Sequence, residues 1–256
     1  MRYIVEHKPT LRVVKVIETV SSNNGEMTMS EIARLTDIPR GTILPILQTL
    51  CENHFLHLDA KTMCYSIDLR LFLAGSPFAK SSESFAGLQL AIKELTRKSG
   101  ETAHFGILDN GNVLYVLKSE SPKPVHMYSD IGKILPAYGT AIGKALISDY
   151  SKQEIIDLYG TNLKKLTEKT ITDIDTLYEQ IEEIRRTGFA TECEESNIGI
   201  RCIATPIKMD NRVVAAISIV IPLFRYSEEK QTQIENILKE GRLLFEELLP
   251  HSNIIT

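Results

Sequence analysis

The stretch Thr28-Met-Ser-Glu-Ile-Ala-Arg-Leu-Thr-Asp-Ile-Pro-Arg-Gly-Thr-Ile-Leu-Pro-Ile-Leu-Gln-Thr-Leu50 decides how the first third of the chain folds. Thr28 and Glu31 have the Thr-x-x-Glu spacing of a capping box, which predicts that a short helix begins here. Residues 36–39 (Thr-Asp-Ile-Pro) are typical of a turn. A further helix follows, because apolar side chains recur at helical spacing, at Ile43, Ile46, Leu47 and Leu50.

The residues on either side of this stretch extend the pattern. Before it, Thr10 is expected to cap a helix whose apolar positions are Val13, Val16, Ile17 and Val20. After it, residues 54–58 and 63–67 alternate like two strands joined by the turn 59–62. Three helices followed by a hairpin are the plan of a winged helix-turn-helix, whose last helix reads the major groove of DNA.

The remainder of the chain predicts an α+β domain, in which an antiparallel sheet is flanked by helices. Gly75-Ser76-Pro77 is expected to break the chain, and an amphipathic helix follows over 81–99. Strands are expected at 102–108, 113–117, 125–129, 202–209 and 213–222, and helices at 139–149, 152–159, after 172–175 and after Ser227. We therefore expect a DNA-binding domain over 1–75, a linker helix over 76–99 and a second domain over 100–256.

Composition and charge narrow the class of protein. The 256 residues contain no apolar run of the ~20 residues that a membrane span needs, and the N-terminus lacks the apolar region of a signal peptide, so we expect a cytoplasmic protein. The net charge is −4. Residues 1–75 are neutral, with eight basic and eight acidic side chains, and the remaining 21 against 25 give the whole of that charge. A neutral head argues against tight non-specific binding to DNA.

Four cysteines occur, and in a cytoplasmic chain they are thiols. Cys51, His54, His57 and Cys64 are ligand types that suit zinc, but their spacing is not one of the usual finger patterns. The alternative is a helix that ends and leads into a wing strand, with half-buried thiols and imidazoles. We expect this second arrangement, with no bound metal.

A second informative stretch, Gly188-Phe-Ala-Thr-Glu-Cys-Glu-Glu-Ser-Asn-Ile-Gly-Ile-Arg-Cys-Ile-Ala-Thr-Pro-Ile207, is interpreted as the wall of a small-molecule pocket. Gly139-Thr-Ala-Ile-Gly143 would open a helix with small residues, which let a ligand approach the backbone and its free N–H groups. Glu194 and Glu195 are expected to form structural hydrogen bonds or ion pairs with Arg201 or Arg185, or to lie on a solvated face. A DNA-reading head joined to a metabolite sensor is the layout of a one-component transcriptional switch.

With these motifs in family order and spacing, the chain resembles the IclR family of bacterial transcriptional regulators. The matching stretches are Met29-Ser-Glu-Ile-Ala-Arg-Leu-Thr36, Ile38-Pro-Arg-Gly-Thr-Ile43, Gly139-Thr-Ala-Ile-Gly-Lys-Ala-Leu146, Thr170-Ile-Thr-Asp173, Ile184-Arg-Arg-Thr-Gly-Phe189, and Glu194-Glu195 through Gly199-Ile-Arg-Cys-Ile-Ala204. The resemblance implies a winged-helix head, a linker helix, a GAF-like effector domain, a homodimer or homotetramer, and no cofactor.

The resemblance also implies where an effector binds. The family holds the carboxylate of small oxo- or hydroxy-acids at positions that correspond to Ala141 and Ile142. The opposite wall corresponds to Glu192 and Cys202, with Ile200 beside them. Family members often carry Asp and Gly where this chain has Glu192 and Ala141, so we expect an organic acid in a reshaped pocket.

The exposed side of the predicted DNA-reading helix carries Arg40, Gly41, Leu44 and Gln48. Arg40 and Thr42 suit phosphate contacts, Gln48 can pair with an adenine edge, Leu44 can meet a thymine methyl, and Lys61 in the wing can reach the backbone. Pro45 departs from the family, because inside a helix it removes a hydrogen bond. The helix is therefore expected either to begin late, with Thr42 as its cap, or to be kinked at Pro45. Both outcomes put base reading by this helix in doubt and would shift specificity toward backbone contacts and DNA shape.

Two functions from different classes follow. The first, which we favour, is a ligand-responsive regulator, a repressor, that binds operator DNA and a small organic acid and is not an enzyme. The second is a metabolite-binding or thiol-dependent enzyme whose head serves dimerisation only. The second requires a histidine base, His104 or His126, beside the nucleophile Cys202.

Overall fold

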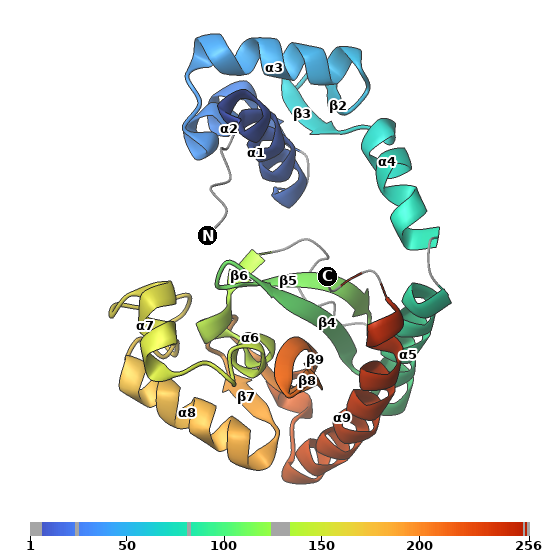
Figure 1. Ribbon diagram of the computed structural model, residues 1–256, viewed down its shortest axis with the longest axis vertical. Helices are drawn as coiled ribbons and strands as arrows, with labels where there is room; N and C mark the ends of the chain where they lie inside the picture. Colours follow the sequence, from blue (N-terminus) through green and yellow to red (C-terminus); the bar gives the residue numbers. More distant parts are fainter. Residues whose placement is uncertain (1–6, 24–25, 81–82, 124–133, 253, 255–256) are drawn as a thin grey trace. The chain divides into compact units, whose positions relative to one another are not determined.

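The computed structural model describes residues 7–23, 26–80, 83–123, 134–252 and 254 (Figure 1). The chain divides into two compact units, residues 1–81 and residues 82–256. Each unit encloses its own hydrophobic core, so each is described by itself.

The N-terminal unit is a winged helix-turn-helix, as the sequence predicts. Its elements are α1 (Lys8–Ser22), β1 (Met27–Thr28), α2 (Met29–Thr36), α3 (Arg40–Glu52), β2 (Leu56–Leu58), β3 (Cys64–Ile67) and α4 (Leu69–Lys80). The strands form an antiparallel sheet in the order β1-β3-β2. Buried side chains from the first three helices and the sheet, among them Val16, Ile32, Leu47 and Leu56, make its core.

The helix boundaries follow local chemistry. The predicted capping box of α2 is present: the Glu31 N–H donates to the Thr28 hydroxyl, and the Thr28 N–H donates to the Glu31 carboxylate at 2.8 Å. The predicted start of α1 at Thr10 is wrong, because the helix already begins at Lys8, with Pro9 in its first turn. Proline suits a first turn, where its missing N–H has no helical partner.

The helix α3 begins at Arg40, so the late start with Thr42 as cap is wrong. The Thr42 and Ile43 N–H groups already donate to the Pro39 carbonyl, at 2.8 and 3.0 Å. Pro45 therefore lies in the interior of the helix, where it has no N–H to donate to the Gly41 carbonyl.

The expected break at Gly75-Ser76-Pro77 is also wrong, because all three residues lie inside α4. Pro77 cannot donate to the Leu73 carbonyl, and the Ser76 hydroxyl donates to it instead, at 3.0 Å. A linker helix over 76–99 is replaced by two helices, α4 in the N-terminal unit and α5 (Glu83–Ser99) in the C-terminal unit.

The C-terminal unit is built on a six-stranded antiparallel sheet with the order β6-β5-β4-β9-β8-β7. The strands are β4 (Thr102–Asp109), β5 (Asn112–Ser119), β6 (Ile134–Pro136), β7 (Ala190–Cys193), β8 (Ile200–Met209) and β9 (Arg212–Pro222). The helices are α5, η1 (Ala137–Gly139), α6 (Ala141–Leu146), α7 (Lys152–Tyr159), α8 (Ile174–Thr187), η2 (Leu223–Arg225), α9 (Glu228–Leu248) and η3 (Leu249–His251). The strand expected at 125–129 lies outside the described residues.

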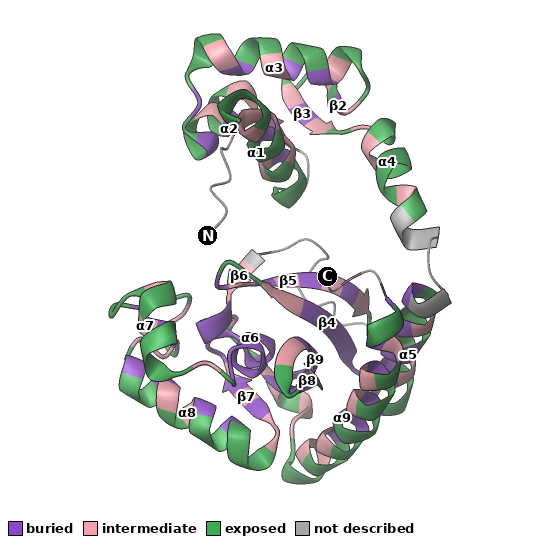
Figure 2. Ribbon diagram, viewed as in Figure 1, coloured by how far each residue is buried: buried purple, intermediate pink, exposed green. Residues whose placement is uncertain are grey.

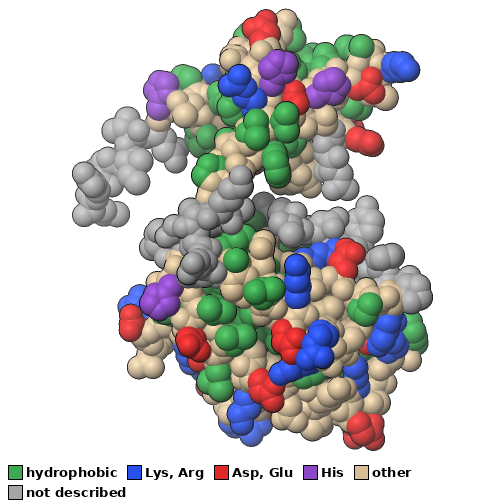
Figure 3. Space-filling model, turned by 90° about the vertical axis from the view of Figure 1, so that its right-hand side faces the viewer, with side chains coloured by type: hydrophobic (Ala, Val, Ile, Leu, Met, Phe, Trp, Pro, Cys, Tyr) green, Lys and Arg blue, Asp and Glu red, His purple; other side chains and the backbone are tan. Residues whose placement is uncertain are grey.

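Helices cover both faces of this sheet (Figure 1). The long helices α5 and α9 pack together on one face, over Ala103, Phe105, Ile217 and Ile219. The short helix α6 packs on the other face, and α7 and α8 lie outside it; α6 is buried along its whole length (Figure 2). On the side drawn in Figure 3, basic and acidic side chains are interspersed over the surface of this unit.

Candidate functional site

The face of the sheet that carries α6 is polar at one end. Strand pairing places Lys118 opposite His104, His104 opposite Ser218, and Cys202 opposite Glu192. Alternation along the strands turns all five side chains toward α6, since Ala103, Phe105 and Ile217 point to α5 and α9. His104, Ser218, Cys202 and Glu192 are buried, and Lys118 is half-buried, with a side chain that is 7% exposed. Ser218 pairs with Ala204 and Cys202 with Val220, so this polar row steps by two residues between β9 and β8. Buried polar groups gathered on one face of a sheet mark a candidate ligand site.

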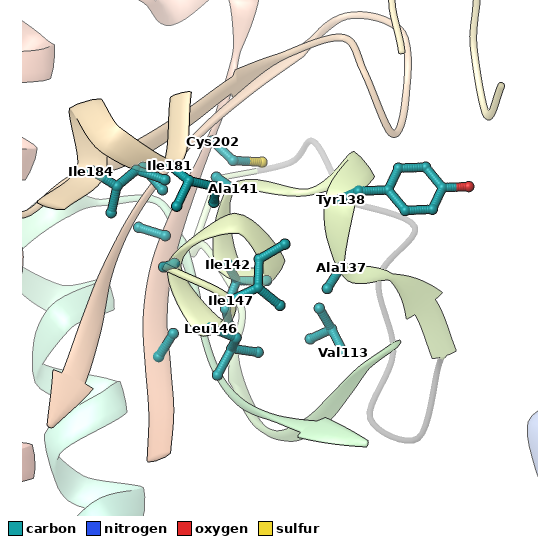
Figure 4. Close-up of a cluster of buried hydrophobic side chains, with 14 of the residues drawn as sticks. Val113, Ala137, Tyr138, Ala141, Ile142, Leu146, Ile147, Ile181, Ile184 and Cys202 are labelled. Carbon is teal, nitrogen blue, oxygen red and sulfur yellow. The ribbon is translucent and has the colours of Figure 1, made fainter. Parts of the chain in front are cut away.

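The structure brings the five predicted effector residues together. Ala141 and Ile142 form the first turn of α6, and Ile200 and Cys202 lie on β8 in the same buried cluster (Figure 4). Glu192 lies on β7 directly opposite Cys202. All five are buried, and binding of an effector by them stays a prediction.

Glu192 is the acidic centre of this group. Its carboxylate accepts the Glu195 N–H at 2.8 Å and the Ser196 hydroxyl at 3.0 Å, and it is hydrogen-bonded to the Cys202 thiol. Burial raises the pKa of Glu192, although these donors oppose the rise. Tyr115 reaches the same group: it is hydrogen-bonded with Thr140, and its pKa is raised by burial and by the neighbouring Cys202 and Glu192.

The electrostatics do not support a thiol nucleophile. Burial, together with the charge of Glu192, raises the pKa of Cys202 and disfavours the thiolate. Burial and the charge of Lys118 lower the pKa of His104 to about 3, which keeps the imidazole neutral. His126, the other histidine considered as a base, lies outside the described residues.

The ion pairs expected between Glu194 or Glu195 and Arg201 or Arg185 are wrong. Structural hydrogen bonds, the other expectation, are present, since the Gly199 N–H donates to the Glu194 carboxylate at 2.8 Å. Both carboxylates are buried rather than solvated. Glu195 binds the ammonium group of Lys144 through both oxygens, at 2.6 and 2.7 Å, and Glu194 pairs with Lys169. Lys144 has no exposed surface and also donates to the Gln180 side chain at 2.7 Å, so one buried cation joins α6, α8 and the turn after β7.

The small residues around α6 have a packing role that the sequence did not predict. A Cβ atom on Gly143 would lie 2.2 Å from the carbonyl oxygen of Ala137, so only glycine fits where α6 crosses η1. The Thr140 hydroxyl caps the helix by accepting the Gly143 N–H at 3.0 Å.

Sequence reasoning missed two residues of the polar row, Lys118 and Ser218, and also Tyr115, whose ring contacts His104. The available signal was the appearance of polar side chains at alternate positions of apolar strands, as in Ile217-Ser218-Ile219. The signal becomes useful only when the strand pairing is known, because pairing decides which of these positions share a face.

The predicted DNA-contacting residues lie as expected. Arg40, Gly41, Leu44 and Gln48 are exposed on α3, opposite the buried Ile43 and Leu47, and Thr42 is half-buried. Lys61 is exposed in the turn between β2 and β3, and the Arg40 guanidinium is held by the Ser30 hydroxyl at 3.2 Å. Their contact with DNA stays a prediction.

The four candidate zinc ligands do not form a metal site. Within the described residues, no group of three or more His, Cys, Asp and Glu side chains is placed to hold a metal ion. The Cys64 thiol instead lies against the Thr62 carbonyl, and His54 faces Asp68 at 3.5 Å. Among the described helices, none is long and apolar enough to cross a bilayer.

Comparison with known proteins assigns the family. The model of the bacterial transcriptional regulator IclR C-terminal domain matches residues 80–242, and that of the IclR helix-turn-helix domain matches residues 10–60. The chain belongs to the IclR family of transcriptional regulators.

Several relatives share this organisation. The chain is 31% identical to the HTH-type transcriptional regulator KdgR of Escherichia coli over 86% of its own length and 84% of that protein. The crystal structure of an IclR regulator from Alicyclobacillus acidocaldarius has a TM-score of 0.86 at 23% identity, over 95% of this chain and 99% of the other. A homologue from Microbacterium hydrocarbonoxydans, complexed with 4-hydroxybenzoate, has a TM-score of 0.77 at 21% identity, over 95% of this chain and all of the other. Both structures share the fold.

Proposed function

We propose that this regulator is a cytoplasmic repressor that binds a small organic acid in its C-terminal unit, and that this binding changes its affinity for operator DNA. The observation that carries the proposal is the buried polar row beneath α6. Buried carboxyl and thiol groups cost solvation free energy, and a ligand that forms hydrogen bonds with them would offset that cost. The proposed effector contacts are Ala141, Ile142, Glu192, Ile200 and Cys202.

Two observations on other proteins support an acid as the effector. A homologue with the same fold was crystallised with 4-hydroxybenzoate, which is an organic acid. Relatives 27% identical to the chain are named transcriptional repressors AllR, which supports repression as the sign of control.

We propose that α3 reads the operator with its exposed face, Arg40 to Gln48, while Lys61 holds the backbone from the wing. Pro45 and Leu44 leave few polar groups for base edges on this face. Specificity therefore comes in large part from backbone contacts and DNA shape, in addition to a Gln48–adenine pair.

A route for the signal follows from the two faces of the sheet. His104 faces the polar row, while its neighbours Ala103 and Phe105 pack under α5 and α9 on the opposite face. A shift of β4 on effector binding would therefore reach α5, the helix that follows the head in the sequence. Such a shift changes the populations of head arrangements that fit DNA.

The regulator is proposed to act as a homodimer or homotetramer, because winged helices generally read paired half-sites. An apolar stripe on α4 supports self-association: Leu69, Phe72 and Leu73 have exposed fractions of 63%, 69% and 54% and lie at helical spacing.

The test is a fluorescence-anisotropy titration of the full chain on DNA from upstream of its own gene, with and without small carboxylates. We expect specific binding that one acid weakens at least tenfold, and a decrease of affinity with rising salt. The absence of specific binding in every condition would contradict the proposal. Variants Arg40→Ala and Gln48→Ala should weaken specific binding, whereas Lys239→Ala, on the exposed surface of α9, should not.

A further inference from the structure

The buried ion pair of Lys144 with Glu195 lies between the two walls of the candidate effector site. Lys144 follows Ala141 and Ile142 in α6, which forms one wall, and Glu195 follows Glu192 in the turn after β7, which forms the other. The Lys144 ammonium group binds both oxygens of the Glu195 carboxylate, at 2.6 and 2.7 Å. One pair of charges therefore sets the distance between the two walls.

Glu195 and the residue after it hold the carboxylate of Glu192. The Glu195 N–H donates to one oxygen of that carboxylate at 2.8 Å, and the Ser196 hydroxyl donates to the other at 3.0 Å. The Glu195 carbonyl accepts the Thr170 hydroxyl at 2.7 Å. Glu195 thus uses its carboxylate, its N–H and its carbonyl in short contacts, so a movement of its side chain also moves the donors that hold Glu192.

Stability of the fold does not account for this ion pair. Lys144 and Glu195 are both buried, and the solvation free energy that two buried charges lose largely offsets their attraction. Apolar side chains of similar volume often fill such a space at equal or greater stability. An ion pair differs from an apolar contact in its direction and length, because two short hydrogen bonds fix one arrangement of α6 and the turn.

We propose that Lys144 is a positioning residue of the effector site, which holds the Glu192 carboxylate in place through Glu195 and Ser196. The inference rests on the proposed function, since Glu192 matters to a regulator only where an effector binds. Lys144 does not contact the effector itself, because the Gln180 side chain accepts the third proton of its ammonium group at 2.7 Å. That contact also connects the arrangement to α8.

The thiol of Cys202 indicates where Glu192 lies, because the two side chains are hydrogen-bonded. The experiment is infrared spectroscopy of the full chain, in which the difference between wild type and Cys202→Ala identifies the S–H stretching band of Cys202. The frequency of this band falls as the thiol donates a stronger hydrogen bond. Glu192→Ala gives the frequency without this acceptor.

In Lys144→Met we expect the band to broaden and to move toward its frequency in Glu192→Ala, because the turn after β7 no longer has a fixed position. The double variant Lys144→Met/Glu195→Leu should show the same shift. It leaves neither charge of the pair in the core, so it should fold even if Lys144→Met does not, as judged by circular dichroism. The control Lys152→Met removes an exposed ion pair with Asp175 and should leave the band unchanged.

An unchanged band in the double variant, or a shift away from the Glu192→Ala frequency, would show that Glu192 stays against Cys202 without Lys144 and would overturn the inference. A wild-type band at the Glu192→Ala frequency would overturn it as well. The measurement involves neither effector nor DNA, so either result leaves the proposed effector site standing. Absence of specific binding in the anisotropy titration would instead reject the proposed function without changing the band.

Discussion

Gly143 fixes the position of α6, the helix that covers the polar row. At this position a Cβ atom would lie 2.2 Å from the carbonyl oxygen and 2.3 Å from the Cα of Ala137, both of which belong to the backbone and cannot rotate away. Replacement by alanine must therefore separate α6 from η1. We expect Gly143→Ala to lower the free energy of unfolding of the C-terminal unit by about 3 kcal/mol, at the upper end of the usual cost of overpacking. Urea unfolding followed by circular dichroism measures it.

Gly41 is the matched control for this prediction. It is also a helical glycine, but a Cβ atom there would meet no other atom within 4 Å. Gly41→Ala should change the stability by less than about 1 kcal/mol, and in the favourable direction, because alanine is the better helix former. A Gly143→Ala protein as stable as wild type would show that α6 is free to move away from η1.

The residues of the polar row explain why a ligand is expected where the core would otherwise be apolar. Glu192, Cys202 and Tyr115 all have raised pKa values, first of all because they are buried. Burial therefore disfavours the ionised form of each of these groups. We expect a site of this kind to recognise hydroxyl and carboxyl oxygens by hydrogen bonds.

Among the elements, α3 contains a proline that removes one of its backbone hydrogen bonds. Pro45 lies in the interior of the helix and is exposed, so its ring gains no burial in return for the missing hydrogen bond to the Gly41 carbonyl. Replacement by alanine restores that bond, which raises the free energy of unfolding by up to about 3 kcal/mol. It also increases the conformational entropy of the unfolded chain, which lowers the free energy of unfolding by up to about 1 kcal/mol. We expect Pro45→Ala to stabilise the N-terminal unit by about 2 kcal/mol in thermal unfolding.

Pro77 in α4 provides the comparison. There the carbonyl that the proline leaves without its N–H, that of Leu73, already accepts the Ser76 hydroxyl. Pro77→Ala should therefore stabilise less than Pro45→Ala. The reverse order would mean that α3 has adapted its backbone to the proline, and that the proline is part of the shape that α3 presents to DNA.

The elements that could be predicted from the sequence are those with local signals. The capping box of α2 lies where predicted, and α8 begins at Ile174, within the segment 172–175 from which a helix was expected. Asp173 caps this helix, and Gly188, in the left-handed conformation, ends it. The expected strands on either side of residues 109–112 and 210–212 are joined by tight turns, with positive φ at Asn110 and Gly111 and again at Asp210 and Asn211. The short strands β6 and β7 carry no such local signal, because only pairing with β5 and β8 makes them strands.

The residues of the candidate site also differ in whether the sequence alone could identify them. Its positions on α6, β7 and β8 could be named from family motifs, because those motifs are contiguous in the sequence. The partner of Lys144 could not be identified from the sequence, because Glu195 lies 51 residues further along the chain. Lys118 could not either, because its relation to Glu192 depends on the register of β5, β4, β9, β8 and β7, with a bulge between Phe105 and Gly106.

At the scale of the whole molecule, the chain separates the two tasks of a regulator. The N-terminal unit closes its own small core from the first three helices and three strands, and the C-terminal unit closes a core on each face of its sheet. Smaller units bury a smaller fraction of their surface and are less stable for that reason. We expect the N-terminal unit to unfold at the lower temperature.

The same separation predicts that substitutions in the two units act independently. In calorimetry of the full chain we expect two transitions, with Pro45→Ala raising only the lower one and Gly143→Ala lowering only the upper one. In the double variant the two changes should add within about 0.5 kcal/mol, because the sites share no partner. An effector at 100 times its Kd should add about 2.7 kcal/mol to the upper transition. A single transition, or a shift of the lower transition in Gly143→Ala, would show that the stability of the N-terminal unit depends on the C-terminal unit. Coupling between the effector site and the DNA-binding face would then act through folding as well as through geometry.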